Sequence, residues 1–222
     1  MPLQRDVDEC LGTWWGISPG SGSIQRAFRR VEEHGLVEII CPSHEKLGWR
    51  SRPSNLIRLS ERGGDVYRLL AGRDPAASYT MELLRRHKSA EHAVLNMETA
   101  EILWRAGYEV ELFPEPVDVR RGTYYPDLRA EVEGHPHLIY VECERVVGVK
   151  ELQPQAMVRK WELYYAASGG RFHVSTPTRE EMEASAAHIL SWAGGRPLVL
   201  RMMDVAQCRE HPSREIWVTY TG

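Results

Sequence analysis

Apolar and polar residues alternate over two short stretches in the middle of the chain, at 128–132 and 138–143. A period of two residues is typical of β-strands that expose one face. Between these stretches, the residues Gly134-His135-Pro136 favour a tight turn. The pattern therefore predicts a β-hairpin that extends from about Tyr124 to Arg145.

A helical period dominates the first third of the chain. Apolar residues recur at helical spacing over 24–36, where Ser21 or Ser23 can cap a helix and Gly35 can end it. Strands are predicted at 37–40 and 55–59 with a polar loop between them, and further helices at 3–17 and 59–70. A helix followed by a hairpin with a basic tip is typical of a winged helix-turn-helix domain.

The polar side of the 24–36 helix is basic, and so is the loop between the two strands. In a winged helix, this helix lies in the major groove of double-stranded DNA, and the wing reaches phosphates or the minor groove. The candidates are Gln25, Arg26, Arg29 and Arg30 for base contacts, and Lys46, Arg50, Arg52 and Arg58 for phosphate contacts. Alternatively, the domain is a protein-interaction module, and Trp14 and Trp15 suit a core or dimer contact.

Asp74-Pro75 interrupts the helical pattern and predicts a boundary between a winged-helix domain at 1–75 and a second domain at 76–222. The second domain is predicted to contain a long helix over 81–106, a strand at 108–113, the hairpin, and a helix at 151–167. A strand at 171–177, a helix at 179–193, a strand at 196–204 and an edge strand at 215–220 follow. The chain is therefore predicted to be an α+β protein.

Composition is typical of a cytoplasmic protein. Hydrophobic residues make up 42% of the 222 residues, and no apolar run approaches the ~20 residues of a membrane span. The N-terminus lacks the basic-then-apolar order of a signal peptide, and the four cysteines lack the spacing of a zinc site or a disulfide framework. Residues 1–88 carry a net charge of +3 and the remainder −6, which favours the first part as the phosphate-facing surface.

Three acidic residues lie at the ends of the predicted hairpin. Asp127 begins the first strand, and Glu142 and Glu144 lie two residues apart near the end of the second, so both glutamates point to one face. Because antiparallel strands place the start of one beside the end of the next, we expect the three carboxylates to converge. Oxygen ligands of this kind suit Mg²⁺, although a solvated hairpin with acidic ends is the simpler alternative.

Pro126-Asp127, followed after fourteen residues by Glu142-Cys143-Glu144, resembles the motif of the PD-(D/E)XK nuclease-like superfamily. The resemblance implies an αβββαβ restriction-endonuclease-like domain in which Asp127 and Glu142 bind Mg²⁺ or Mn²⁺. Glu144 stands where this superfamily usually has lysine. The resemblance assigns the missing lysine to Lys160 on the following helix, as in some members.

The helix before the first strand often donates a further glutamate in this superfamily. By resemblance, Glu98 is the first candidate for this metal ligand and Glu91 the second, and both also fit an exposed helix surface. His92 and Asn96, one turn apart, are expected as polar residues near the site. A single histidine at such a position is more often a structural hydrogen-bonding group than a metal ligand.

The segment 91–103 before the hairpin, with Lys160 and Tyr164 after it, resembles the replication-relaxation family of bacterial mobile-element proteins, which join a winged helix to such a domain. The resemblance implies a nucleoid-associated DNA endonuclease in which Lys160 stabilises charge on the phosphate or positions the nucleophile. A homodimer and a relaxase, transposase or other mobile-element partner are compatible with it.

Glu144 leaves a second hypothesis open, because a carboxylate near the attacking water repels phosphate unless a second metal ion neutralises it. The alternative is a catalytically inactive DNA-binding regulator or relaxosome accessory protein, which uses the nuclease-like fold for dimerisation or for holding DNA. A protein-interaction adaptor is a third possibility.

Overall fold

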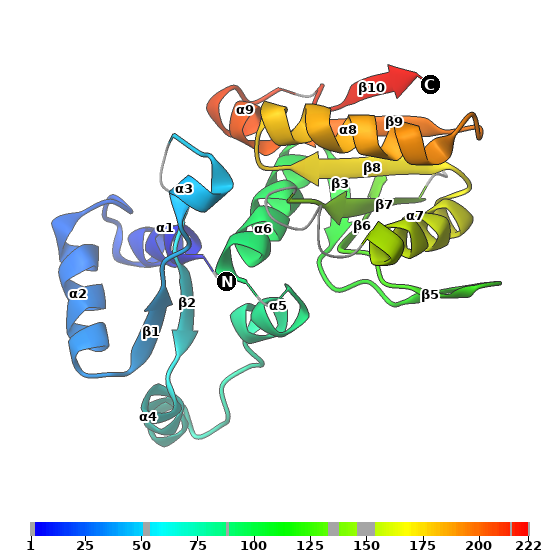
Figure 1. Ribbon diagram of the computed structural model, residues 1–222. Helices are drawn as coiled ribbons and strands as arrows, with labels where there is room; N and C mark the ends of the chain where they lie inside the picture. The colour runs from blue at the N-terminus through cyan, green and yellow to red at the C-terminus, as the bar shows by residue number, and fades with distance from the viewer. Residues whose placement is uncertain are drawn as a thin grey trace. The chain divides into compact units, whose positions relative to one another are not determined.

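The computed structural model describes residues 3–50, 54–87, 89–132, 138–145, 154–213 and 215–221 (Figure 1). The chain divides into two compact units, Met1–Lys46 with Ser51–Val94, and Leu47–Arg50 with Leu95–Gly222. Residues 76–94, which the sequence pattern grouped with the second domain, belong to the first unit. Within the described ranges, no helix has both the length and the apolar content that crossing a membrane requires.

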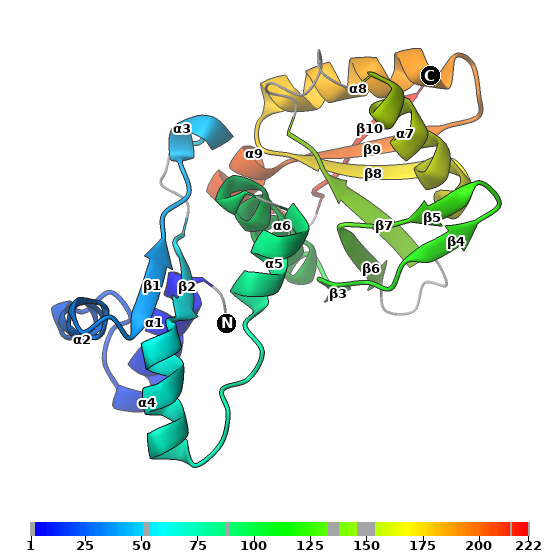
Figure 2. The same cartoon turned by 60° about the horizontal axis from the view of Figure 1, so that its bottom comes forward.

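The first unit contains helices around a two-stranded sheet. Its elements in chain order are α1 (Gln4–Trp15), α2 (Gly22–Glu33), β1 (Val37–Ile40), α3 (His44–Leu47), β2 (Leu56–Leu59), α4 (Glu61–Ala71) and α5 (Tyr79–His87). β1 and β2 pair antiparallel, from Val37 opposite Leu59 to Ile40 opposite Leu56, and Leu3 forms an isolated bridge to Leu56. α2 lies beside β1 in both views (Figures 1 and 2).

The predicted helix over 24–36 is confirmed, with slightly earlier ends. The Ser21 hydroxyl accepts a hydrogen bond from the Ile24 backbone nitrogen, and Gly35 has the left-handed φ of +65° that ends the helix. Ile24 and Phe28 are buried on the inner side of α2. The helical period therefore identified the face of α2 that packs against the core.

Two predictions about this part of the chain were wrong. The polar loop between β1 and β2 contains the short helix α3, in which the Ser43 hydroxyl accepts the Lys46 backbone N–H. The predicted single helix over 81–106 is two helices, α5 and α6 (Ala90–Arg105). The Ser89 hydroxyl accepts the His92 backbone N–H at 3.1 Å, so Ser89 caps α6 and starts a new helix.

A mixed sheet forms the centre of the second unit. After α6 come β3 (Tyr108–Glu111), β4 (Val117–Val119), β5 (Gly122–Tyr124), β6 (Leu128–Val132), β7 (Leu138–Cys143), α7 (Pro154–Ser168), β8 (Arg171–Thr176), α8 (Arg179–Ala193), β9 (Val199–Asp204), α9 (Val205–Glu210) and β10 (Val218–Thr221). Among the described residues, six strands lie in the order β10-β9-β8-β7-β6-β3. The β7-β8-β9 pairs are parallel and the other pairs antiparallel.

Helices cover both faces of this sheet. α7 and α8 lie on the same face (Figure 2), where Phe172 and Val174 of β8 pack with Met182 and Ile189 of α8 in one apolar cluster. Side chains alternate along a strand, so Ser175 points to the opposite face, where its hydroxyl bonds the Thr99 hydroxyl of α6. The second unit therefore has three layers, and the sheet is the middle one.

The predicted strands of the second domain are confirmed, as is the helix at 179–193. The strands of the central hairpin are β6 and β7, while its turn at Gly134-His135-Pro136 lies outside the described residues. The helix expected at 151–167 is described from Pro154 to Ser168. The β4–β5 hairpin and α9 were not predicted. The structure is thus an α+β protein with a six-stranded mixed sheet in its described part.

Candidate carboxylate–lysine site

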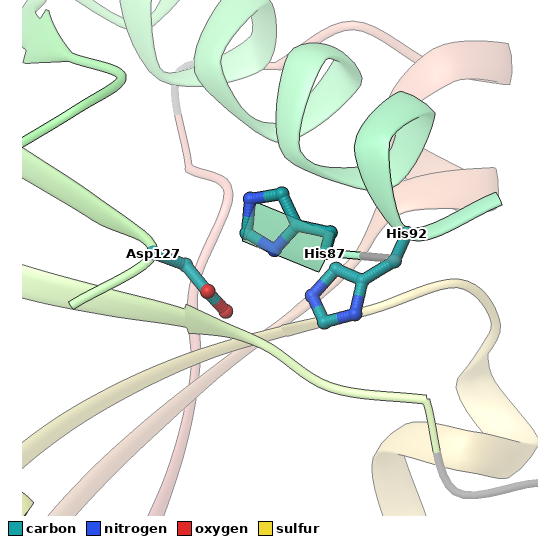
Figure 3. A group of neighbouring side chains, drawn as sticks. All are labelled: His87, His92 and Asp127. Atoms are coloured by element: carbon teal, nitrogen blue, oxygen red, sulfur yellow. The ribbon is translucent and has the colours of Figure 1, made fainter. Parts of the chain in front are cut away.

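The backbone position of Asp127 lies opposite Glu142, where β6 begins and β7 ends. Leu128 pairs with Val141 in the antiparallel β6–β7 ladder, so the next position in register places Asp127 opposite Glu142. Asp127, labelled in Figure 3, precedes β6, and its Oδ2 accepts a hydrogen bond of 2.8 Å from the Cys143 backbone nitrogen. The predicted meeting of the two strand ends is therefore present.

Glu142 is buried, with 1% of its surface exposed, and its carboxylate contacts two side chains from other elements. The Tyr124 hydroxyl of β5 donates a hydrogen bond to Oε1, and the Lys160 ammonium of α7 lies 2.5 Å from Oε2. Lys160 also forms an ion pair with Glu144. Lys160 therefore joins the two glutamates that flank Cys143.

The three carboxylates do not gather into a single tight ligand set. Among the described residues, Asp127, Glu142 and Glu144 cannot each supply one oxygen such that all three lie within 4.8 Å of one another. The Lys160 ammonium instead contacts both glutamates. The arrangement is thus two adjacent carboxylates, Asp127 and Glu142, with a lysine shared between Glu142 and Glu144.

The electrostatics of the site follow from burial and from crowding of negative charge. Burial raises the pKa of Glu142 to about 8; Asp127 and Glu144 act in the same direction, and Lys160 opposes them. For Lys160, burial lowers the pKa, but the surrounding carboxylates outweigh it and hold the pKa well above its ordinary value. The lysine therefore stays protonated, and Glu142 is the group whose ionisation is difficult.

Tyr124 was not among the residues that the sequence singled out. It is 2% exposed, and burial together with the charge of Glu142 raises the pKa of its phenol well above 10. No local motif signals this role, because the contact depends on the β4–β5 hairpin, whose short strands were not predicted. The adjacent tyrosines in Thr123-Tyr124-Tyr125-Pro126-Asp127 were the available clue.

Tyr164, which follows Lys160 by one turn of α7, is fully buried and has a structural role. Its hydroxyl donates to the Tyr140 carbonyl oxygen at 2.6 Å and accepts the His173 backbone N–H at 2.8 Å. These bonds fix α7 against β7 and β8. The position of Lys160 relative to Glu142 is thereby determined by a buried, satisfied tyrosine.

The two candidate helix glutamates have basic partners. Glu98 is 2% exposed and lies 3.4 Å from Nε of Arg209, whose guanidinium stacks 4.3 Å above the Trp49 ring. Glu91 accepts a hydrogen bond from the Ser43 backbone nitrogen and lies 3.7 Å from the Lys46 ammonium. Both glutamates are therefore engaged in ion pairs, rather than lying on an open helix surface.

His92 packs against a second histidine. The rings of His87 and His92 are stacked with their centroids 4.5 Å apart (Figure 3), and Asn96 is buried one turn further along α6. His87 was not a candidate in the sequence, since it was expected in the middle of a longer helix. The break between α5 and α6 is what brings the two rings together.

The basic face predicted for α2 is solvent-exposed. Gln25, Arg26, Arg29 and Arg30 are all exposed, opposite the buried Ile24 and Phe28. Arg26 donates a hydrogen bond to the Ser23 hydroxyl at 3.1 Å. The side chains of Arg29 and Arg30 have no ion-pair or hydrogen-bond partner within the described part of the chain. This face can therefore meet a polyanion without first breaking an internal contact at those two residues.

The predicted phosphate contacts from the loop and β2 are in different environments. Arg58 is paired across the β1–β2 ladder with Glu38, Lys46 is paired with Glu91, and Arg52 lies outside the described residues. Arg50 is exposed. It lies in the segment Leu47–Arg50, which belongs to the second unit. In this segment Trp49 is 3% exposed, and its Nε1 donates a hydrogen bond of 2.8 Å to the Pro177 carbonyl oxygen.

No protein-family model, curated protein or solved structure matches this chain.

Proposed function

We propose that this chain is a DNA-binding protein that hydrolyses DNA phosphodiesters with Mg²⁺ or Mn²⁺ at the site formed by Asp127, Glu142 and Lys160. The observation that carries the proposal is the position of the Lys160 ammonium, which contacts both Glu142 and Glu144 while Asp127 lies opposite Glu142 in register. Two carboxylates at neighbouring strand ends, with a lysine beside one of them, match the residue types of a PD-(D/E)XK nuclease site.

The order of elements supports the same assignment. α6 is followed by the antiparallel strands β3, β6 and β7, then by α7 and by β8, which runs parallel to β7. This order supports the proposed αβββαβ arrangement of a restriction-endonuclease-like core, with the β4–β5 hairpin inserted. Asp127 immediately precedes the second core strand, and Glu142 lies near the end of the third.

The donor set fits a hard divalent cation. Asp127 and Glu142 offer carboxylate oxygens, the ligands that Mg²⁺ prefers, and Cys143, whose carbonyl is a further oxygen donor, follows Glu142 in sequence. Three carboxylates and one ammonium leave a formal charge of −2 on these side chains, an excess consistent with the raised pKa of Glu142. When bound, the ion would polarise the phosphate and acidify a coordinated water molecule.

The protein's own groups have separable roles. The Cys143 backbone N–H fixes the orientation of the Asp127 carboxylate. Lys160, with one third of its side chain exposed, can leave Glu142 while keeping its ion pair with Glu144, and can then stabilise negative charge that develops on the phosphate. Glu144 then binds Lys160 and not the metal ion. This role explains a carboxylate at the position where the superfamily usually has lysine.

DNA recruitment is assigned to α2 in the first unit, which we interpret as the recognition helix of a winged helix. Exposed Gln25, Arg26, Arg29 and Arg30 are suited to base edges and phosphates in the major groove. Arg50 and Arg58 are weaker candidates, because the first belongs to the second unit and the second is paired with Glu38. The resemblance to the replication-relaxation family supports mobile-element DNA as the substrate, with a relaxase or transposase as partner.

A second candidate function is DNA holding without turnover. It is favoured by one observation, that both oxygens of Glu142 are already engaged, by Tyr124 and by Lys160. A cation would have to compete with the ammonium for Oε2. In that case the site is a structural ion pair that stabilises the sheet, and the chain is an accessory or regulatory DNA-binding protein.

Plasmid cleavage separates the two functions. The wild-type chain is expected to nick or linearise supercoiled plasmid with Mg²⁺ or Mn²⁺ but not with EDTA, and Asp127→Asn should reduce the rate at least about a hundredfold. Glu180→Gln, a change at an exposed acid in the first turn of α8, is the matched control and should cleave normally. Salt-sensitive plasmid binding without any cleavage by the wild-type chain would instead support DNA holding.

A further inference from the structure

Two arginines without acidic partners lie on neighbouring strands of the sheet in the second unit. Arg171 begins β8, and Arg201 lies on β9 opposite His173. Both side chains are exposed, and within the described ranges neither forms an ion pair or a hydrogen bond. By contrast, Arg129 on β6 lies 2.6 Å from the carboxylate of Glu131. The two arginines therefore differ from an arginine on another strand of the same sheet, which has an acidic partner.

Both arginines point to one face of the sheet, because side chains alternate along a strand. Arg171 and His173 are two residues apart on β8, and His173 is opposite Arg201. Arg201 is in turn opposite Thr219 of β10, at the edge of the sheet (Figure 1). With ~3.3 Å per residue along a strand and ~4.8 Å between strands, the α-carbons of the two arginines are about 8 Å apart. One extended ligand can therefore contact both guanidinium groups.

Trp217 lies beside His173 and is held from two directions. Its ring meets the His173 ring at a centroid distance of 5.1 Å and an angle of 75°, and its Nε1 donates a hydrogen bond of 3.1 Å to the Tyr108 hydroxyl. Trp217 is half-buried, so part of the residue remains accessible to solvent. The name β8–β10 surface is used below for five residues: Arg171, His173, Arg201, Trp217 and Thr219.

No acidic side chain on the neighbouring strands offsets the two arginines. Among the described residues of β7, β8 and β9 that point to this face, none is acidic. Glu142 is opposite Val174, which packs with α8 on the other face. The β8–β10 surface is therefore separate from the carboxylate–lysine site.

His173 lies in a region of positive electrostatic potential. It is 4% exposed, and its Nδ1 atom is buried without a hydrogen-bond partner among the described residues. Burial, and after it the charges of Arg201 and Arg171, lowers the pKa of His173 to about 4. The imidazole is therefore neutral near pH 7, because a third cation beside the two arginines is unfavourable. An anion at this surface would meet two positive charges that no acidic side chain of these strands offsets.

We propose that the β8–β10 surface binds single-stranded DNA, with Arg171 and Arg201 on phosphates and Trp217 against a base. Proteins that bind single strands combine cationic side chains along the backbone with aromatic rings on which bases stack. A duplex hides the faces of its bases within the stack, so an accessible tryptophan beside two arginines favours a single strand. The inference rests on the proposed function for the identity of the ligand as DNA. It adds a DNA-binding surface separate from α2 and from the carboxylate–lysine site.

The test compares a single strand with a duplex on the whole chain. The single strand is a fluorescein-labelled oligothymidylate of about 12 nucleotides. Affinities are measured by fluorescence anisotropy at several salt concentrations, in EDTA so that no cleavage occurs. Arg171→Ala/Arg201→Ala removes the two cations. Arg179→Ala is the matched control, because Arg179 is exposed on the same unit and already paired with Glu183 at 3.0 Å.

We expect Arg171→Ala/Arg201→Ala to weaken oligothymidylate binding roughly tenfold or more at 0.1 M salt. The slope of log affinity against log salt should fall by about 1.4, from about 0.7 for each phosphate contact, and duplex affinity should not change. Trp217→Leu should weaken oligothymidylate binding about tenfold without changing the slope, because stacking involves no charge. Arg179→Ala should change neither quantity. If circular dichroism shows that Trp217→Leu does not fold, the arginine variant decides, since both of its changes are at exposed side chains.

The outcomes separate this inference from the proposed function. Equal oligothymidylate affinity and slope in wild type and Arg171→Ala/Arg201→Ala overturn the inference, whether or not the chain cleaves plasmid. An equal loss for single strand and duplex also overturns it, as does unchanged affinity in a folded Trp217→Leu. Displacement of the oligothymidylate by inorganic phosphate, at an equal concentration of phosphate groups, would assign the surface to a small anion instead. A selective loss of single-strand binding in a chain that never cleaves plasmid supports the surface and rejects the nuclease.

Discussion

The ammonium of Lys160 lies 2.5 Å from Oε2 of Glu142, so the positive charge of the site comes from α7 rather than from the strand that carries the glutamate. Tyr164, one turn further along α7, is bonded to the backbones of β7 and β8 and holds the helix in this position. The lysine is therefore placed by the packing of a helix on a sheet. Its effect on Glu142 and on catalysis can be separated by substitution.

Lys160→Met is expected to abolish cleavage while preserving Mn²⁺ binding. Methionine keeps most of the length of the side chain but removes the cation that would stabilise charge on the phosphate, so cleavage should fall at least about a hundredfold. Mn²⁺ should bind equally well or more tightly, because no ammonium competes for the Glu142 and Glu144 oxygens. The measurements are plasmid cleavage and calorimetry, with Arg159→Met, an exposed neighbour on α7, as control. Loss of Mn²⁺ binding in Lys160→Met would contradict this division of roles.

Glu142 should make the protein less stable as pH rises through the neutral range. Its pKa is about 8 in the folded chain, above the ordinary value of 4.5, so the folded state holds a proton that the unfolded state releases between these two values. Stability is then fully present below about pH 4.5 and is lost toward pH 8, by a total of about 4 kcal/mol.

Urea unfolding at pH 5 and pH 8 tests this dependence. The free energy of unfolding of Glu142→Gln should change less between the two pH values than that of the wild type, because glutamine does not titrate. Glu180→Gln should retain the wild-type dependence. If wild type and Glu142→Gln lost equal stability over this range, another group would be responsible.

Sequence patterns predicted the helices and strands in which apolar and polar residues recur at a regular period. They thereby also predicted the strand ends at which Asp127 and Glu142 lie. The helix at 179–193 was predicted to the residue, because its apolar period matches the face that packs on β8. Asp127 and Glu142 could be paired in advance, since antiparallel register follows from the hairpin. Lys160 could be predicted as a site residue only from the resemblance to a family, in which some members carry the site lysine on the following helix instead of on the strand.

Other features depend on contacts between distant segments and had no local signal. Trp49 lies in a stretch that reads as a polar loop, yet it is buried by its bond to Pro177, 128 residues away. The start of α6 at Ala90 depends on the Ser89 cap, within a stretch whose apolar residues continue the helical period. Tyr124 reaches Glu142 only because β5 pairs with β4 in a hairpin of three-residue strands.

DNA binding through α2 should depend on Arg29 and Arg30. If each contacts a phosphate, Arg29→Ala/Arg30→Ala should reduce the slope of log affinity against log salt by about 2 and weaken binding roughly tenfold or more at 0.1 M salt. The measurement is fluorescence anisotropy with a DNA duplex at several salt concentrations. Arg68→Ala is the control, because Arg68 is already paired with Asp65 and Asp74. Equal slopes for wild type and the double variant would exclude this helix face.

Two neighbouring glycines of α4 should respond in opposite ways to alanine. Both Gly63 and Gly64 are buried in the first turns of the helix, after the Ser60 cap. A Cβ atom on Gly63 would lie 1.8 Å from the Leu36 carbonyl oxygen, which also accepts the Ser60 backbone N–H, whereas a Cβ on Gly64 meets only the end of the Arg68 side chain at 3.9 Å. Gly63 therefore permits close packing of α4 on the segment before β1, whereas the packing at Gly64 leaves room for a methyl group.

Gly64→Ala is expected to raise the free energy of unfolding by up to about 1 kcal/mol, because alanine loses less conformational entropy in a helix. Gly63→Ala should lower it by roughly 2 kcal/mol or more, since backbone atoms must move to admit the methyl group. Urea unfolding of the two variants, followed by circular dichroism, measures both. Equal stability of the two variants would mean that α4 does not approach Leu36 as closely as the backbone geometry requires.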